Sequence, residues 1–344
     1  MVYSDEILAI VPARSGSKSV PHKNIKMFAG KPLMAHSINQ ALESGIVSRV
    51  LLSTDSEEYA RIGREFGAYV PFLRPASISG DNSTDLECFI HALEWLLKNE
   101  GKVPKLLIHL RPTCPNRKPS DIVKAVRLLE NNPQWESIRS VVPSPDTPFK
   151  MWYRCDDGEL KPVVESSIKE AHSSPRQFLP PTYLPNGNVD VIRTRTILEK
   201  GLIAGSCVGS MLMSELHDID THEQFAEAEQ SFIWANGIPS NKTFVFDIDG
   251  VIASIVPTID YALAGPITEN ISRVNRLYDA GNKIILFTAR GTVTGINWSD
   301  ITKKQMAEWG VKYHQLLFGK PASDYYIDDK MISLDTLAQL DKVI

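Results

Sequence analysis

Short apolar runs alternate with longer amphipathic segments over the first 130 residues, and this alternation limits the possible folds strongly. The runs Glu6–Val11, Val47–Ser53 and Lys105–Leu110 have the length and apolar character of strands buried on both faces. The segments with helical spacing are Leu33–Glu43, Glu57–Phe66, Leu86–Lys98 and Ser120–Glu130. The alternation predicts an α/β fold in which helices cover both faces of a parallel or mixed sheet.

The pattern changes in the middle of the chain. Prolines are frequent between residues 143 and 186, and this segment is too long for a plain loop. We expect a short β-rich excursion there that contacts substrate or another subunit. A strand (Gly187–Ile192) and a helix (Thr221–Trp234) follow. The polar segment 236–241 contains Gly and Pro, so it predicts a linker between a first domain, 1–235, and a second, 242–344.

A second strand–helix series follows this linker. Its expected elements are Thr243–Phe246, Ile267–Asp279, Lys283–Thr288, Ile301–Trp309, Tyr325–Ile327 and Ser333–Leu340. A chain of 344 residues is long enough for two domains that each bury a core.

Composition excludes several classes of partner. The net charge of −4 includes no basic excess in either part, so a nucleic-acid polymer is not expected to bind. Uninterrupted apolar runs stay far below the roughly 20 residues of a membrane span, so no membrane partner is expected either. The acidic start of the chain is unlike a signal peptide, and the four widely spaced cysteines suit reduced thiols. These features predict a cytoplasmic protein.

The segment that follows the first predicted strand has the composition of a phosphate-binding loop. Small residues in Val11–Lys18 let the backbone approach a phosphate chain, while Arg14, Lys18 and Lys23 supply positive charge. The segment is neither a Walker loop nor Gly-x-Gly-x-x-Gly. A solvated basic turn at the end of a strand is the alternative.

Two pairs of carboxylates lie on alternate residues. Asp218 and Asp220 could share one hard cation that bridges phosphate oxygens, or they could cap the helix that starts at Thr221. Asp247 and Asp249 end the apolar run Phe244–Phe246, which suits a Mg²⁺ and phosphate pocket at a strand tip. Acidic residues also end strands without any site, so a lone Asp-x-Asp is a weak signal.

Motifs in the first domain occur in a recognisable order. They are Pro12-Ala-Arg-Ser-Gly-Ser-Lys18, Lys23-Asn24, Gly30-Lys-Pro-Leu33, Ser53-Thr-Asp55, Arg74-Pro75, Arg111-Pro-Thr-Cys-Pro-Asn-Arg117, Arg176-Gln177, Asn186-Gly187 and Asp218-Ile-Asp220. Over residues 6–235 this order resembles the acylneuraminate cytidylyltransferases, the CMP-sialic acid synthetase family.

The resemblance implies a Rossmann-like nucleotidyltransferase fold and transfer of CMP from CTP to a sialic-acid-like sugar acid. It implies that Lys18 and Lys23 act in catalysis and that Asp218 and Asp220 bind Mg²⁺. It also implies substrate-binding roles for Arg14, Ser17, Asn24, Arg74, Asn82, Ser83, Arg111, Arg176 and Asn186. The spacing of the motifs identifies no residue that would recognise the base, so a nucleoside triphosphate other than CTP is an alternative.

Arg111 departs from the family pattern, which usually has Gln at this position beside the acceptor sugar. An arginine adds a permanent charge and a bidentate anion-binding group. The departure suggests an acceptor that differs from ordinary sialic acid by carrying a further anionic group.

Four polar motifs of the second domain are ordered in the same way. They are Asp247-Ile-Asp249-Gly, Thr288-Ala-Arg290-Gly, Gly319-Lys320-Pro321 and Tyr326-Ile-Asp328-Asp329. The set resembles the haloacid dehalogenase superfamily, and residues 288–329 are similar to its small capsule-biosynthesis phosphatases. About 17 residues separate Asp249 from the next predicted helix, too few for a folded cap, so a capless Rossmannoid domain is implied.

This second resemblance implies a phosphate monoesterase. Asp247 would be the nucleophile and Asp249 the acid and base, while Thr288 and Lys320 would hold the phosphoryl oxygens. Asp247, Asp249, Asp328 and Asp329 would form the Mg²⁺ site. Capless members often close their site with a neighbouring subunit, which implies a homo-oligomer, a dimer or a tetramer.

Together the two resemblances imply a bifunctional enzyme that first removes phosphate from a sugar-acid phosphate and then activates the free sugar acid as its CMP derivative. One alternative keeps the transferase and makes the second domain an oligomerisation or regulatory module. Another is a glycosyltransferase that binds a nucleotide sugar through Asp218 and Asp220.

Overall fold

Successive side chains of strand β1 (Tyr3–Pro12) face two different hydrophobic layers. Ala9 and Val11 pack with helices α1 (Leu33–Glu43), α2 (Glu57–Glu65) and α4 (Pro119–Glu130). Leu8 and Ile10 pack on the other side with α3 (Asp85–Glu100) and α5 (Thr194–Lys200). This alternation explains why the strand is apolar at consecutive positions.

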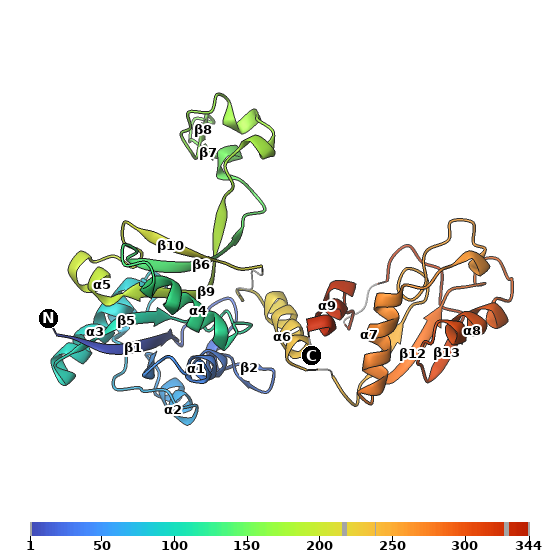
Figure 1. Cartoon of the computed structure of the whole chain (residues 1–344), viewed down its shortest axis with the longest axis horizontal. Helices are drawn as coiled ribbons and strands as arrows, with labels where there is room; N and C mark the ends of the chain where they lie inside the picture. Colours follow the sequence, from blue (N-terminus) through green and yellow to red (C-terminus); the bar gives the residue numbers. More distant parts are fainter. Residues whose placement is uncertain (1, 215–218, 238, 327–329, 343–344) are drawn as a thin grey trace. The chain divides into compact units, whose positions relative to one another are not determined.

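The computed structural model describes residues 2–214, 219–237, 239–326 and 330–342. The chain divides into two compact units, Met1–Ala228 and Glu229–Ile344 (Figure 1). The boundary falls inside helix α6 (His222–Asn236).

The first unit contains a six-stranded sheet in the order β10-β6-β9-β5-β1-β4. Its other strands are β4 (Arg49–Ser53), β5 (Val103–His109), β6 (Ser137–Pro143), β9 (Tyr183–Arg193) and β10 (Val208–Leu212). Strand β9 is antiparallel to both neighbours, and the remaining pairs are parallel. The prediction of an α/β unit with a mixed sheet and helices on both faces is therefore confirmed.

Local sequence signals set the ends of several helices. Ser56 caps α2 by accepting a hydrogen bond from the backbone N–H of Tyr59. Thr84 and Glu87 form a capping box at the start of α3, and Gly101 ends that helix in the left-handed region. A small hairpin, β2 (Met27–Phe28) and β3 (Lys31–Pro32), leads into α1.

The proline-rich excursion leaves the sheet after β6 and returns through β9 (Figure 1). It contains a two-stranded antiparallel hairpin, β7 (Trp152–Arg154) and β8 (Leu160–Pro162), and short 3-10 turns. Several of its large apolar side chains are exposed: Met151, Trp152, Tyr153, Leu160 and Phe178. We call residues 144–182 the arm.

The second unit has a parallel sheet in the order β11-β12-β13. The strands are β11 (Thr243–Phe246), β12 (Lys283–Thr288) and β13 (Gln315–Phe318). Helices α7 (Thr268–Asp279), α8 (Ser299–Glu308) and α9 (Leu334–Ala338) share one core with them.

The predicted strand Tyr325–Ile327 is wrong in its described part. Tyr325 and Tyr326 lie outside any strand, and Ile327 lies outside the described residues. The third strand is β13, because Gln315–Phe318 pairs in parallel with Ile285–Thr288. Among the described residues, none of the helices combines the length and the apolar character that crossing a membrane requires.

Candidate functional site

A cavity of about 410 Å³ in the first unit lies where β1 and β5 end. Parallel strands direct their carboxyl ends, and the loops that follow, to the same edge of a sheet, where ligands of α/β proteins bind. Nine predicted site residues line this cavity: Arg14, Ser17, Lys18, Lys23, Asn24, Arg74, Ser83, Arg111 and Asp220.

The loop after β1 is fixed by side chains rather than by regular structure. Asp55, which follows β4, accepts hydrogen bonds from Ser15 N at 2.8 Å and Ser15 Oγ at 2.9 Å. Asn24 Nδ2 donates to the carbonyl oxygen of Arg14 at 3.0 Å. The loop therefore presents its cationic side chains from a defined backbone.

Each predicted triphosphate-binding cation already faces a carboxylate. Arg14 Nη1 lies 2.8 Å from Asp81 Oδ1, and Lys18 pairs with the other oxygen of Asp81. Lys18 and Arg14 together lower the pKa of Asp81. Lys23 is nearly buried; its Nζ donates to the carbonyl oxygen of Ile219 and lies 3.3 Å from Asp220 Oδ1.

Arg74 is a buried cation in the cavity wall, with 7% of its surface exposed. Its Nε and Nη2 have no hydrogen-bond partner in the part of the chain that the structure describes. A buried guanidinium without full pairing is costly for the folded state, so a ligand acceptor is the natural complement of these donors.

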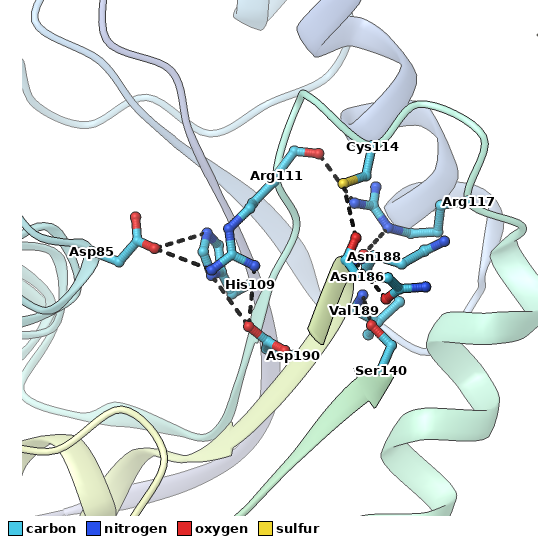
Figure 2. Close-up of polar contacts among 10 residues, drawn as sticks. All are labelled: Asp85, His109, Arg111, Cys114, Arg117, Ser140, Asn186, Asn188, Val189 and Asp190. Atoms are coloured by element: carbon cyan, nitrogen blue, oxygen red, sulfur yellow. Dashed lines mark hydrogen bonds and ion pairs between the residues drawn. The ribbon is translucent and has the colours of Figure 1, made fainter. Parts of the chain in front are cut away.

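Arg111 lies between two carboxylates, as Figure 2 shows. Its Nη1 is 3.2 Å from Asp190 Oδ2, and its Nη2 is 3.3 Å from Asp85 Oδ2. Gly187 is required beside it: φ is +67°, and a Cβ there would lie 3.2 Å from Cys114 Sγ and 3.5 Å from Arg111 Cδ.

The ring of His109 lies between the same two carboxylates. Its Nε2 is 3.9 Å from Asp85 and its Nδ1 is 3.9 Å from Asp190, too far for hydrogen bonds (Figure 2). Burial, followed by the charge of Arg111, lowers the pKa of His109 well below its ordinary value. Burial raises the pKa of Asp190, although Arg111 opposes this effect. The histidine is therefore neutral.

Arg117 fixes the backbone that carries Arg111. Its Nη2 donates to the carbonyl oxygen of Arg111 at 3.1 Å, while its Nη1 donates to Ser37 Oγ and Gln40 Oε1, both at 3.1 Å. Burial lowers the pKa of Arg117 to about 10. Arg117 thus has a supporting role behind the cavity.

Three predicted substrate-binding residues do not line the cavity. Asn82 is exposed, and Arg176 donates to the carbonyl oxygens of Ser144 and Pro145 within the arm. Asn186 is buried, and its carbonyl oxygen accepts a weak hydrogen bond from Cys114 Sγ at 3.5 Å (Figure 2). Asp218 lies outside the described residues.

The second unit brings together its predicted residues at the ends of its strands. Asp247, directly after β11, forms an ion pair with Lys320 Nζ, and the Lys320 N–H donates to the carbonyl oxygen of Thr288 at 3.1 Å. Thr288 is buried, and its Oγ1 accepts a hydrogen bond from Arg290 N at 3.1 Å. Asp328 and Asp329 lie outside the described residues.

Asp249 is held by Arg290. Arg290 Nη2 lies 2.7 Å from Asp249 Oδ1, and Arg290 Nε lies 2.9 Å from Oδ2. The sequence motif contained Arg290, but no role was predicted for it. An arginine two residues after a buried strand-end threonine could have indicated a partner for the acidic pair, although spacing alone does not name that partner.

Potential metal ligands lie close together in the arm. Within the described ranges, a group of three is formed by Cys155, Asp157 and Glu159 at the tip of the arm hairpin. The predicted metal residues of both units fall partly outside those ranges, so their grouping stays a prediction. Among the described residues, further contributors that sequence reasoning missed are Asp85, His109 and Asp190.

Comparisons with known proteins agree with the geometry of the first unit. A sequence model of the family described as "Cytidylyltransferase" matches residues 8–151. The CMP-N,N'-diacetyllegionaminic acid synthase of Legionella pneumophila is 33% identical over 230 residues, which cover 65% of this chain and 95% of that protein. The chain belongs to the cytidylyltransferase family.

Further similarities cover smaller shares or have weaker scores. An N-acylneuraminate cytidylyltransferase of Escherichia coli is 37% identical over 139 residues, 40% of this chain and 32% of that protein. The solved structure of a CMP:2-keto-3-deoxy-manno-octonic acid synthetase complexed with CTP has a TM-score of 0.49 and 15% identity, and it covers 65% of this chain and 97% of the other.

Proposed function

We propose that the first unit transfers CMP from CTP to a sialic-acid-like nonulosonic acid and releases pyrophosphate. The observation that carries this proposal is the cavity at the carboxyl edge of the sheet, where Arg14, Lys18, Lys23 and Arg74 converge. Membership of the cytidylyltransferase family supports the reaction class, and the names of its relatives support the class of acceptor.

In this reaction a hydroxyl oxygen of the acceptor bonds to the α-phosphorus of CTP, the bond between that phosphorus and the β-phosphate oxygen breaks, and the hydroxyl proton passes to water. Negative charge grows on the leaving pyrophosphate, and fixed cations stabilise it. Lys18 and Arg14 would exchange their shared partner Asp81 for phosphate oxygens. Lys23, held against Asp220, would reach the same phosphates from the other wall.

The contacts of Arg111 bear on the acceptor. Its two terminal nitrogens already face Asp85 and Asp190, so two carboxylates offset the charge of Arg111 before any acceptor binds. We therefore favour a nonulosonic acid without an additional anionic substituent over the anionic acceptor that the sequence suggested.

We further propose that the second unit is a phosphate monoesterase, with Asp247 as nucleophile, Asp249 as acid and base, and Lys320 neutralising charge beside the nucleophile. The support is the convergence of Asp247, Thr288 and Lys320 at the ends of three parallel strands. Its substrate would be the phosphate of the sugar acid that the first unit then activates, as in capsule polysaccharide biosynthesis.

Mg²⁺ is the proposed metal of both units. The donor sets are carboxylates, which suit a hard cation: Asp220 with Asp218 in the first unit, and Asp247 with Asp328 and Asp329 in the second, since both oxygens of Asp249 already face Arg290. The ion would supply positive charge for the phosphate oxygens.

The arm is the proposed contact between copies of the chain in a homo-oligomer, a dimer or a tetramer. Tyr153 and Phe178 expose 62% and 72% of their surfaces, and exposed apolar patches of this kind often mark interfaces. The alternative in which the second unit serves only for oligomerisation or regulation does not use the convergence at Asp247.

One screen tests the proposed transferase activity and its substrates. The full chain with Mg²⁺ is supplied with each of four nucleoside triphosphates and with neutral and anionic nonulosonic acids, and pyrophosphate is measured. We expect release only with CTP and a nonulosonic acid. Release with GTP in place of CTP would overturn the nucleotide assignment, and turnover of a ready-made nucleotide sugar without pyrophosphate would favour a glycosyltransferase.

A further inference from the structure

Arg290 is a charged side chain with no exposed surface, and it bonds both oxygens of a proposed catalytic carboxyl group. The side chain of Arg290 is 0% exposed and that of Asp249 is 23% exposed. Nε and Nη2 of the guanidinium lie 2.9 Å and 2.7 Å from the two oxygens. This is the bidentate arrangement that only arginine provides among cationic side chains.

The guanidinium is itself fixed from the other side. Nη1 donates to Gln305 Oε1 at 2.7 Å and to Thr302 Oγ1 at 3.2 Å, both on α8. The group also lies over the ring of Tyr261, 4.7 Å from its centroid, and Gln305 Nε2 donates to the carbonyl oxygen of Tyr261 at 2.7 Å. Arg290 therefore cannot follow a moving Asp249; it determines where Asp249 points.

We propose that Arg290 is a positioning residue that aims the carboxyl group of Asp249 for proton transfer, and that the second unit thereby acts on phosphate monoesters of aliphatic alcohols. This inference rests on the phosphatase function proposed above. The terminal torsion of an aspartate is otherwise broad. With both oxygens bonded to Arg290 on one edge, the remaining lone pairs point away from it, so the proton is carried on that side only.

Two proton transfers depend on the orientation of the Asp249 carboxyl group. In the first half-reaction an oxygen of Asp247 bonds to phosphorus, the ester bond breaks, and the departing alcohol oxygen keeps the electron pair and takes the proton of Asp249. In the second, a water oxygen bonds to phosphorus as Asp249 accepts a proton of that water. The bond between phosphorus and Asp247 then breaks and releases phosphate.

The leaving group separates this role from a merely structural one. An aliphatic alkoxide is a poor leaving group and needs the proton, whereas p-nitrophenolate leaves without one. The ratio kcat/KM reports the first half-reaction, and kcat also includes hydrolysis of the phosphorylated enzyme. If the carboxyl group of Asp249 is wrongly oriented, kcat/KM should therefore fall more for the aliphatic ester than for the p-nitrophenyl ester.

The test compares full-length wild type and Arg290→Lys on glycerol 2-phosphate and on p-nitrophenyl phosphate. Lysine keeps the charge but cannot bond both oxygens. We expect kcat/KM for glycerol 2-phosphate to fall about 10- to 100-fold, and that for p-nitrophenyl phosphate to change less than about threefold. The variant should also show a burst of one p-nitrophenolate per enzyme, because hydrolysis of phosphorylated Asp247 slows.

Gln305→Leu provides a second variant that loosens Arg290 without removing its charge, and it should show the same pattern with a smaller amplitude. Arg273→Lys is the matched control, since Arg273 pairs with Asp341 elsewhere in this unit and should leave both esters unaffected. Equal losses of kcat/KM for the two esters would overturn the positioning role. A wild type inert toward both esters would contradict the phosphatase function itself.

Discussion

Arg111 Nη1 lies 3.2 Å from Asp190 Oδ2, and this contact joins a cavity-lining residue to a nearly buried carboxylate on β9. Arg111→Gln restores the residue usual in the family but leaves Asp190 without its partner. We expect the free energy of unfolding to fall by about 2 kcal/mol, because a buried carboxylate loses its charged hydrogen bond. Urea unfolding measures this change.

The double variant Arg111→Gln with Asp190→Asn should recover most of the lost stability, since the uncompensated charge is gone. If the effects of the two single substitutions on the free energy of unfolding simply add, the pair contributes nothing specific. The interpretation of Arg111 as internally paired is then wrong.

Arg74→Met should weaken the binding of CTP without weakening the fold. The guanidinium is buried and two of its nitrogens lack partners among the described residues, so its loss removes a desolvation cost. We expect KM for CTP to rise about tenfold or more, from the loss of at least one charged hydrogen bond, while the melting temperature is unchanged or higher. Arg61→Met, on the exposed face of α2, is the matched control.

Asp247→Asn should separate the two proposed activities. Replacing a nucleophilic carboxylate with an amide is expected to reduce phosphate release about 10³-fold or more. CMP transfer, measured as pyrophosphate in the same preparation, should be retained. Phosphate release that persisted in this variant would show that Asp247 is not the nucleophile.

His109 should make the stability of the first unit depend on pH. The folded state keeps His109 neutral because its pKa lies well below the ordinary 6.5, whereas the unfolded chain takes up a proton near that value. Its contribution is therefore complete above about pH 6.5 and is lost as the pH falls toward the folded-state pKa. The slope is at most about 1.4 kcal/mol per pH unit.

Unfolding of wild type and His109→Gln between pH 7.5 and 5.5 measures this slope as a difference, because other groups titrate in both proteins. The advantage of wild type should shrink as the pH falls. His222→Gln, at the exposed start of α6, should leave the slope unaltered. A difference that is constant with pH would mean that folded His109 titrates normally.

The double variant Tyr153→Ser with Phe178→Ser should shift the proposed oligomer toward the monomer. Both side chains are largely exposed on the arm, so their replacement should cost the folded monomer little. Sedimentation equilibrium measures the mass, and Val293→Ser, 75% exposed in the second unit, is the control. A wild type that is already monomeric, or a double variant that keeps its mass, would contradict the proposed contact.

Sequence reasoning placed most elements because apolar periodicity is a local property. Helix α1 has the predicted bounds, Leu33–Glu43, and strand β12 matches at Lys283–Thr288. Strand β13 was missed because four residues of mixed exposure, Gln315–Phe318, carry little periodicity. The neighbouring prediction at 325–327 fails in its described part, where Tyr325 and Tyr326 expose 86% and 43% of their surfaces.

The site residues also divide into those that lie close together in the sequence and those that only the fold brings together. Cationic residues in short motifs, such as Lys18 and Lys23, could be predicted because one loop presents them. The partners of Arg111 could not, since Asp85 begins a helix 26 residues before Arg111 and Asp190 lies on a strand 79 residues after it. Only the sheet order, with β9 beside β5, brings them together. Arg290 belongs to a sequence motif, but the fold determines that it contacts Asp249.

Strand β9 has one further consequence. It begins at Tyr183, where the arm rejoins the sheet, and it carries Asp190 to the contact with Arg111. The strand pairs with β6 at Tyr183–Pro185 and again from Asp190, where β5 joins it on the other side, and the register shifts between these two stretches. A mechanical load on the arm would therefore act first on residues 186–189, the irregular part of the strand, where Gly187 lies beside Arg111.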